Sequence, residues 1–250
     1  MLYNYHTHTK RCRHANGTDR EYVENAIKLG IKTLGFSDHA PYIFDGNYYS
    51  HYRMFPDEIM EYKNSIMALK REYKNDIDIK YGFELEYYRD KHEREMEFLR
   101  KYEPEYIILG QHFVGSEPQG EYVACQSDDQ FLIDYVDECI EALKTGDFVY
   151  LAHPDIAGYD FSEKTVEIEY SRLLQFCKDN NFPIEINVLG ISGNRWYSKR
   201  KIFTLAEKIG TKVIVGLDAH SPKVISQKSF DMANELVSGL NLNIIEKLDI

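Results

Sequence analysis

The sequence has few of the features that mark secreted or membrane proteins. Its 250 residues include four cysteines without paired spacing: Cys12, Cys125, Cys139 and Cys177. Neither a disulfide framework nor a thiolate zinc site is therefore expected. No apolar run approaches the ~20 residues of a membrane span, and the first residues lack the charged-then-apolar pattern of a secretory signal. We expect a cytoplasmic protein with reduced thiols and no membrane partner.

Positive charge is also scarce. The 30 basic residues are outnumbered by 41 acidic ones, which gives a net charge of −11. A nucleic-acid partner needs basic patches that neutralise its phosphates, so this balance argues against one. The chain has no Gly-x-x-x-x-Gly-Lys phosphate loop, and the segment Gly190-Ile191-Ser192-Gly193 is one residue short of a nucleophile elbow. P-loop and serine-hydrolase mechanisms are therefore not indicated.

What the chain has is histidine, placed in a recurring position. The first ten residues resemble a short strand that ends at His6 and His8, whose side chains share one face because strand side chains alternate. Two parallel imidazoles can hold one metal ion, although a surface pair near a terminus has the same spacing. Later apolar runs each lead to a further candidate ligand: His39, Glu84, His112, His153, and the pair Asp218 and His220. Independent core histidines have no reason to share this position, so we expect successive strands to deliver ligands to one end of one sheet.

Strand and helix patterns alternate about seven times along the chain. One predicted helix begins at a capping box of Thr18 and Glu21 and ends at Gly30. Such alternation indicates a parallel sheet with right-handed crossovers, either a closed barrel or an open doubly wound sheet. We favour the barrel, because an open sheet would spread the ligands over too many strand spacings of ~4.8 Å. Residues 113–124 are predicted to form a hairpin, and the aromatic segment 41–55 is predicted to wall the site.

Six segments of the chain resemble, in order, the motifs of the polymerase and histidinol phosphatase (PHP) family. They are His6-Thr7-His8, Ser37-Asp38-His39, Gly82-Phe83-Glu84, Gly110-Gln111-His112, Ala152-His153-Pro154-Asp155 and Asp218-Ala219-His220-Ser221-Pro222. The likeness spans residues 3–222. Among the members, the chain is most similar to the histidinol-phosphate phosphatases by its length and its last two motifs. The resemblance implies one domain over residues 1–250, folded as a distorted (β/α)7 TIM-like barrel.

The candidate ligands are imidazoles and carboxylates, without thiolates. This donor set suits Zn, Mn or Fe, and its size exceeds what two four-coordinate ions need. The resemblance implies three divalent ions. It assigns His6, His8, Glu84 and Asp218 to the first; Glu84, as a bridge, with His112 and His153 to the second; and His14, His39 and His220 to the third. Asp38 and Glu86 are expected to support ligands by hydrogen bonds, and His51 and His92 are expected to be solvated.

The resemblance also implies an activity. We expect hydrolysis of a small phosphate ester, L-histidinol phosphate to L-histidinol and phosphate, as in histidine biosynthesis. Clustered ions would activate a bridging hydroxide as the nucleophile, without a covalent enzyme intermediate. Glu84 and Asp218 are therefore counted as catalytic. Asp155 is expected to attract the substrate's ammonium group or to donate a proton to the leaving oxygen.

A phosphate group is also commonly bound by the paired N–H donors of an arginine side chain. Relatives often carry Gly-Ile-Arg where this chain has Gly190-Ile191-Ser192. We therefore expect Arg195 to take that role, with Arg200 as the second candidate. Two other functions remain open: a PHP phosphoesterase for another small phosphate or a nucleotide, and a non-catalytic, metal-stabilised regulatory module. The complete ligand set favours an enzyme.

Overall fold

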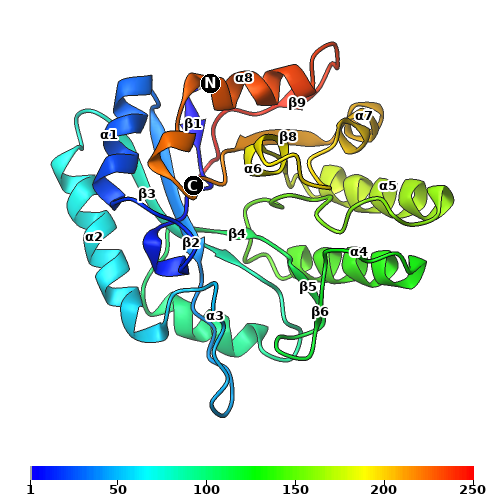
Figure 1. Ribbon diagram of the computed structural model, residues 1–250, viewed down its shortest axis with the longest axis horizontal. Helices are drawn as coiled ribbons and strands as arrows, with labels where there is room; N and C mark the ends of the chain where they lie inside the picture. The colour runs from blue at the N-terminus through cyan, green and yellow to red at the C-terminus, as the bar shows by residue number, and fades with distance from the viewer. Residues whose placement is uncertain (1) are drawn as a thin grey trace.

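A curled sheet of parallel strands forms the centre of the protein, in a computed structural model that describes residues 2–250 (Figure 1). The strands are β1 (Tyr3–Asn4), β2 (Thr33–His39), β3 (Asp78–Leu85), β4 (Tyr106–Leu109), β5 (Phe113–Val114), β6 (Glu121–Tyr122), β7 (Ile184–Asn187), β8 (Lys212–Gly216) and β9 (Asn243–Ile244). Strands β1 to β4 pair in chain order, and β7, β8 and β9 form a second parallel run.

Isolated parallel bridges connect the two runs of strands. Leu151 bridges to Leu109 at the end of β4 and to Ile184 in β7, while Thr7 bridges to Ala219 and brings the two ends of the sheet together. The result is an α/β fold with a curled parallel sheet, as the alternating pattern predicted. The count of seven barrel strands stays a prediction, because the fifth position holds the single bridging residue Leu151 rather than a regular strand.

Helices lie around the outside of the strands (Figure 1). They are α1 (Asp19–Leu29), α2 (Ile59–Glu72), α3 (His92–Arg100), α4 (Asp129–Lys144), α5 (Glu163–Asp179), α6 (Val188–Ser192), α7 (Arg200–Ile209) and α8 (Gln227–Leu236), with 3-10 turns at Lys10–Cys12, Pro56–Glu58 and Pro222–Val224. The predicted capping box of Thr18 and Glu21 opens α1, and Gly30 ends it with φ 80°. None of these described helices is long and apolar enough to cross a membrane.

The apolar residues of the strands are buried on both faces of the sheet. The larger core fills the space between the strands and the helices. A second cluster is built from residues in or beside distant strands, among them Tyr5, Ile108, Tyr150 and Ile214. Because these strands lie on different parts of the sheet, the second cluster fills the space that the curl encloses. Leu248, from the C-terminal tail, packs against it.

Three local elements bear on the sequence predictions. The hairpin expected after His112 is confirmed as the antiparallel pair β5 and β6. The short helix α6 directly follows β7, and the side chain of Asn187 caps it by accepting from Gly190 N. The C-terminal tail contributes β9 beside β8.

Candidate metal centre

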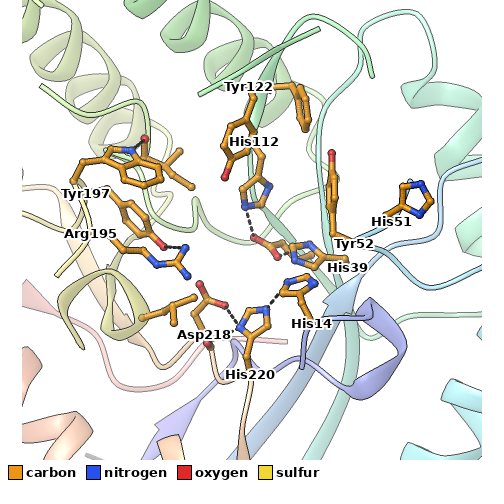
Figure 2. Close-up of a pocket in the computed structure, with 15 residues that line it drawn as sticks. His14, His39, His51, Tyr52, His112, Tyr122, Arg195, Tyr197, Asp218 and His220 are labelled. Carbon is orange, nitrogen blue, oxygen red and sulfur yellow. Dashed lines mark hydrogen bonds and ion pairs between the residues drawn. The ribbon is translucent and has the colours of Figure 1, made fainter. Parts of the chain in front are cut away.

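The predicted ligands converge on one end of the curled sheet. Figure 2 labels five of them: His14, His39, His112, Asp218 and His220. Six of the side chains are buried: His6, His8, His39, Glu84, His153 and Asp218. His112 and His220 are half-buried, and His14 is exposed on the loop after the first 3-10 turn. Each follows or ends a strand, except His14 and His153, and His153 follows the bridging residue Leu151. Two of them, His153 (φ 27°) and Asp218 (φ 48°), adopt a left-handed backbone that is strained for residues other than glycine.

Glu84 lies at the centre of the cluster. Its Oε1 is 2.8 Å from Nε2 of His153 and 3.9 Å from Nε2 of His112. Its Oε2 is 2.9 Å from Nδ1 of His39 and 3.6 Å from Nε2 of His6. Both oxygens of one carboxylate therefore face imidazole nitrogens from four segments of the chain.

Asp218 organises the other side of the cluster. Its Oδ1 is 3.0 Å from Nε2 of His8 and 3.3 Å from Nδ1 of His220. The opposite nitrogen of His220, Nε2, lies 2.9 Å from Nε2 of His14. Asp218 and Glu84 are linked through His8, whose Nε2 is 3.4 Å from Glu84 Oε2. The predicted ligands thus form one continuous group.

The electrostatics of the cluster favour a bound cation. Burial opposes ionisation of Glu84 and Asp218, but the neighbouring histidines hold the pKa of both carboxyls well below the usual range. Burial lowers the pKa of His6, but Glu185, Asp218 and Glu84 outweigh it and raise that pKa to about 10. Glu84 Oε2 and Asp218 Oδ1 are buried and lie close to ring nitrogens, but none of these contacts has hydrogen-bond geometry among the described residues. Buried, ionised oxygens of this kind need either protonated histidines or metal ions beside them.

The donor set fits divalent transition metals. It offers imidazole nitrogens and carboxylate oxygens, the ligands that Zn, Mn and Fe take in proteins. Three of the groups whose ligand atoms lie within 4.8 Å of one another are His6, His8 and Glu84; His8, His39 and His220; and His6, His153 and Asp218. These groups overlap, so the assignment of each residue to one of three ions stays a prediction.

Three carboxylates outside the predicted ligand set contact ring nitrogens of the predicted histidine ligands. Asp38 lies 3.4 Å from Nδ1 of His8, and Glu86 lies 3.3 Å from Nδ1 of His112, in the supporting positions expected for them. The third, Glu185 in β7, accepts from Nδ1 of His6 at 2.8 Å and was missed. The signal was present, because Glu185 and Asn187 alternate along β7 as two polar residues of one face.

Two glycines leave room for the buried carboxylates. A Cβ on Gly110 would overlap Oε1 of Glu84 and lie 2.5 Å from its Cδ. A Cβ on Gly216 would overlap Oε1 of Glu185 and lie 2.5 Å from its Cδ. Each glycine belongs to a neighbouring strand or strand end, so the sheet can bring a carboxylate this close only where no side chain intervenes.

A cavity of about 670 Å³ opens over the cluster (Figure 2). Ligand side chains line one side of it: His14, His39, Glu84, His112, Asp218 and His220. Aromatic and apolar side chains line much of the rest: Tyr52, Phe113, Tyr122, Ile156, Leu189, Trp196 and Tyr197. Arg195 enters from the side opposite the histidines, with Nη1 3.5 Å from the hydroxyl of Tyr197. The cavity therefore has one polar end, formed by the predicted metal ligands, and a wall of aromatic and apolar side chains.

Comparison with known proteins agrees with this geometry. The model of the PHP domain matches residues 4–188. The chain belongs to the PHP domain family. It is 25% identical over 244 residues to a probable histidinol-phosphatase of Deinococcus radiodurans, covering 92% of this chain and 91% of that protein. It is 30% identical over 147 residues to the histidinol-phosphatase of Bacillus subtilis, covering 55% and 54%.

Two solved structures resemble the fold of this chain over most of its length. A histidinol phosphate phosphatase from Lactococcus lactis, complexed with zinc, L-histidinol and phosphate, gives a TM-score of 0.74 at 18% identity and covers 98% of this chain and 95% of its own. A structure from Listeria monocytogenes gives the same TM-score at 21% identity and covers 92% and 99%. At these identities the likeness establishes the fold.

Two predicted site residues of this PHP protein lie elsewhere. Arg200 donates to the carbonyl oxygens of Leu236 and Ser238, at 2.6 and 2.8 Å, where α8 ends. It does not line the cavity, and its guanidinium satisfies free carbonyls at a helix C-terminus. The phosphate contact expected for Arg200 stays a prediction that this position does not favour.

Asp155 also lies away from the residues that line the cavity. Its side chain is fully buried and accepts from the backbone N–H groups of Ser198 and Lys199 at 2.9 and 3.0 Å and from the hydroxyl of Tyr159 at 2.7 Å. Both oxygens are occupied by protein donors and neither faces the cavity. Asp155 therefore fixes the segment that follows Arg195, and a substrate-facing role does not fit its position.

The two histidines expected to be solvated differ from each other. His51 is exposed and lines the cavity rim. His92 is buried, with its ring against Phe148 and its Nε2 2.9 Å from Oδ2 of Asp147. The prediction for His92 was wrong because α3 turns that side of its charged surface toward the protein.

Proposed function

We propose that this PHP protein is a metal-dependent phosphomonoesterase that hydrolyses L-histidinol phosphate to L-histidinol and phosphate. The proposal rests chiefly on one observation: both oxygens of buried Glu84 face ring nitrogens from four segments, at the floor of a cavity that Arg195 enters. With it we propose a single PHP-type domain over residues 1–250, with the (β/α)7 barrel of that family.

The residues would divide the work as follows. His6, His8, Glu84 and Asp218 would hold a first divalent ion; Glu84, His112 and His153 a second; and His14, His39 and His220 a third. Such ions would lower the pKa of water toward neutrality and offset the charge of the phosphate. Arg195 would bind phosphate oxygens from the opposite side with its fork of N–H donors. Asp155 would keep the segment after Arg195 in place through the backbone of Ser198 and Lys199.

The identity of the alcohol is supported by the relatives and by the cavity wall. The Lactococcus lactis structure holds zinc, L-histidinol and phosphate, and the Deinococcus radiodurans and Bacillus subtilis relatives carry histidinol-phosphatase names. Here, the rings of Tyr52, Phe113, Tyr122 and Trp196 line the cavity. Such a wall can stack a flat imidazole and attract a cation through its ring faces.

One observation favours a second candidate substrate. Among the described residues that line the cavity, the only carboxylates are Glu84 and Asp218, which belong to the metal cluster. No separate acid is therefore aimed at an ammonium group. A phosphate monoester of an uncharged aromatic alcohol would use the same wall without needing that partner.

The test combines metal analysis with a substrate panel. We expect two to three transition-metal ions per chain and a kcat/KM for histidinol phosphate at least about tenfold above those for tyrosine phosphate, sugar phosphates and nucleotides, since discrimination follows relative kcat/KM. Preference for an aryl phosphate would select the second candidate. A metal content of one ion or none per chain, together with no phosphate release from any substrate of the panel, would contradict the proposal.

A single substitution tests the central carboxylate. Glu84→Gln keeps the shape of the side chain but removes its charge. It should lose metal and reduce turnover by orders of magnitude, because one residue serves two ions. Glu97→Gln, at an exposed site on α3, is the matched control. Full metal content and normal turnover in Glu84→Gln would show that the bridge lies elsewhere, with Glu86 tested next.

A further inference from the structure

A buried arginine lies beneath the cavity wall, outside the predicted site. Arg53, in the segment between β2 and α2, has 1% of its surface exposed. Its Nη2 donates to Glu86 Oε1 at 2.7 Å and to Glu117 Oε2 at 2.8 Å. Glu86 directly follows β3, and Glu117 lies in the turn between β5 and β6. One cation therefore joins three separate segments through two buried anions.

Aromatic rings enclose this group. The guanidinium carbon of Arg53 lies 5.1 to 5.9 Å from the ring centroids of Tyr52, Tyr42 and Tyr88. The hydroxyl of Tyr88 donates to Glu86 Oε2 at 2.7 Å and contacts Glu117 at 3.1 Å. With the cation in place, both carboxylates have a charged partner and a hydroxyl donor, as buried charges require.

The same group touches both the cavity wall and the metal cluster. Tyr52, the residue before Arg53, stacks on Phe113 of the hairpin with ring centroids 6.2 Å apart and planes at 10°. Both rings line the cavity, and Figure 2 shows Tyr52 on the rim opposite Tyr197. The oxygen of Glu86 that accepts from Arg53 also lies 3.3 Å from Nδ1 of His112.

We propose that Arg53 is a positioning residue: it fixes the aromatic wall of Tyr52 and Phe113 relative to the metal centre, and so sets how tightly the alcohol part of the phosphate ester binds. This inference rests on the proposed function. Arg53 joins Glu86, directly after β3, to Glu117, in the hairpin turn. Without this cation, the two carboxylates would repel each other and the hairpin would lose its contact with the sheet. A displacement of ~1 Å in a binding surface can cost up to ~100-fold in rate.

The test uses Arg53→Met in the metal-loaded protein, with two ligands that probe different ends of the cavity. Inorganic phosphate reaches only the polar end, whereas phenyl phosphate also needs the wall. We expect the KM for phenyl phosphate to rise at least about tenfold, while the Ki for inorganic phosphate changes less than about twofold and metal content is kept. Arg53→Lys, which keeps the charge, should recover part of the loss. Arg172→Met, which breaks an ion pair with Glu169 and Asp137 on the far helices, is the control.

Equal changes in KM and Ki, or no change in either, would overturn the inference. If Arg53→Met fails to fold, Glu117→Gln provides the test. This variant weakens the contact between Arg53 and the hairpin and leaves the contact between Arg53 and Glu86 in place. It should show the same selective rise in KM for phenyl phosphate.

A second measurement is independent of activity. Tyr49, on the same segment as Arg53, is exposed, so chymotrypsin can report the mobility of residues 42–55. We expect cleavage there to be about tenfold faster in Arg53→Met than in the wild type, because local opening governs proteolysis. Equal rates would overturn the inference. If the wild type hydrolysed no phosphate ester, the proposed function would fail, while the cleavage rates would still decide whether Arg53 holds the wall.

Discussion

Glu185 accepts a hydrogen bond from Nδ1 of His6 at 2.8 Å, and both side chains are fully buried. This contact fixes the tautomer of His6 and leaves its Nε2 directed at the metal cluster. The other oxygen of Glu185 accepts from the backbone N–H of His153 at 3.1 Å and from Nδ2 of Asn187 at 2.8 Å. One carboxylate therefore orients two predicted ligands from opposite sides of the sheet.

Glu185→Gln should weaken metal binding by roughly 10- to 100-fold, the usual effect of losing a group that orients a ligand. The amide keeps the size of the side chain, but its NH2 group replaces one acceptor oxygen. It would face two donors: either His6 Nδ1 and the Tyr150 hydroxyl, or His153 N and Asn187 Nδ2. Competition with a fluorescent chelator measures the affinity. Glu169→Gln, at a partly buried carboxylate bound to Arg172, is the control. Equal metal affinities in Glu185→Gln and the wild type would show that His6 does not depend on Glu185.

Gly110→Ala should displace Glu84 and so reduce the amount of metal bound at the predicted centre. The added Cβ would overlap Oε1 of Glu84, and both residues are buried, so the carboxylate must move. Metal content per chain is the measurement. Adding Glu84→Asp withdraws the carboxylate by one methylene and should recover part of the lost metal, a non-additive effect expected only for groups in contact. Full metal loading in Gly110→Ala alone would exclude the steric argument.

The predicted ligands could be found from the sequence because their positions depend on local rules. Side chains alternate along a strand, and parallel strands end at one edge of a sheet. These two rules are enough to gather His6, His8, Glu84 and His112, and the same alternation would have identified Glu185 in β7. The capping box of Thr18 and Glu21 is equally local and was found.

Sequence patterns could not place residues whose partners come from distant segments. Asp155 accepts from Ser198 and Lys199, which lie 43 and 44 residues away. Arg200 binds carbonyls at the end of α8, which lie 36 and 38 residues away. No periodicity connects such positions, so only the packing of the helices reveals that both side chains are already engaged. The strands expected before His6 and before His153 are shorter in the structure than their sequence patterns indicate, with two residues in β1 and an isolated bridge at Leu151.

Replacing Arg195 or Arg200 by alanine should change different properties of the protein: catalytic efficiency for Arg195 and stability for Arg200. Arg195→Ala should reduce kcat/KM for a phosphate monoester by roughly 10- to 150-fold, since a charge-assisted contact contributes about 1.5–3 kcal/mol, and metal content should stay the same. Arg200→Ala should leave kcat/KM unchanged and lower stability by about 1 kcal/mol, because carbonyls at the end of α8 lose their donor. Steady-state kinetics and urea unfolding distinguish them. The opposite pattern would place the phosphate grip at Arg200.

Glu95 predicts a pH dependence of stability. Its carboxyl, on the inner side of α3, accepts from the backbone N–H of Ile43 at 3.2 Å. Burial raises its pKa from 4.5 to about 8, against the opposing effects of that hydrogen bond and of Arg53 and Arg94. Below pH 4.5 the carboxyl is protonated in the folded and the unfolded chain alike. Between pH 4.5 and 8 only the unfolded chain releases the proton, so this residue makes folding less favourable as the pH rises, and the effect is constant above pH 8.

Glu95→Gln should therefore stabilise the protein in a pH-dependent way. The amide can still accept from Ile43 but carries no charge to bury. The gain over the wild type should be small at pH 4 and grow to the order of 4 kcal/mol by pH 8, at about 1.36 kcal/mol per pKa unit. Urea unfolding at pH 4, 6 and 8.5 measures this difference. Glu97→Gln, exposed on the same helix, should show no such trend. A gain that is the same at pH 4 and pH 8.5 would mean that Glu95 is ionised in the folded protein, and that its burial is balanced by a partner such as Arg53.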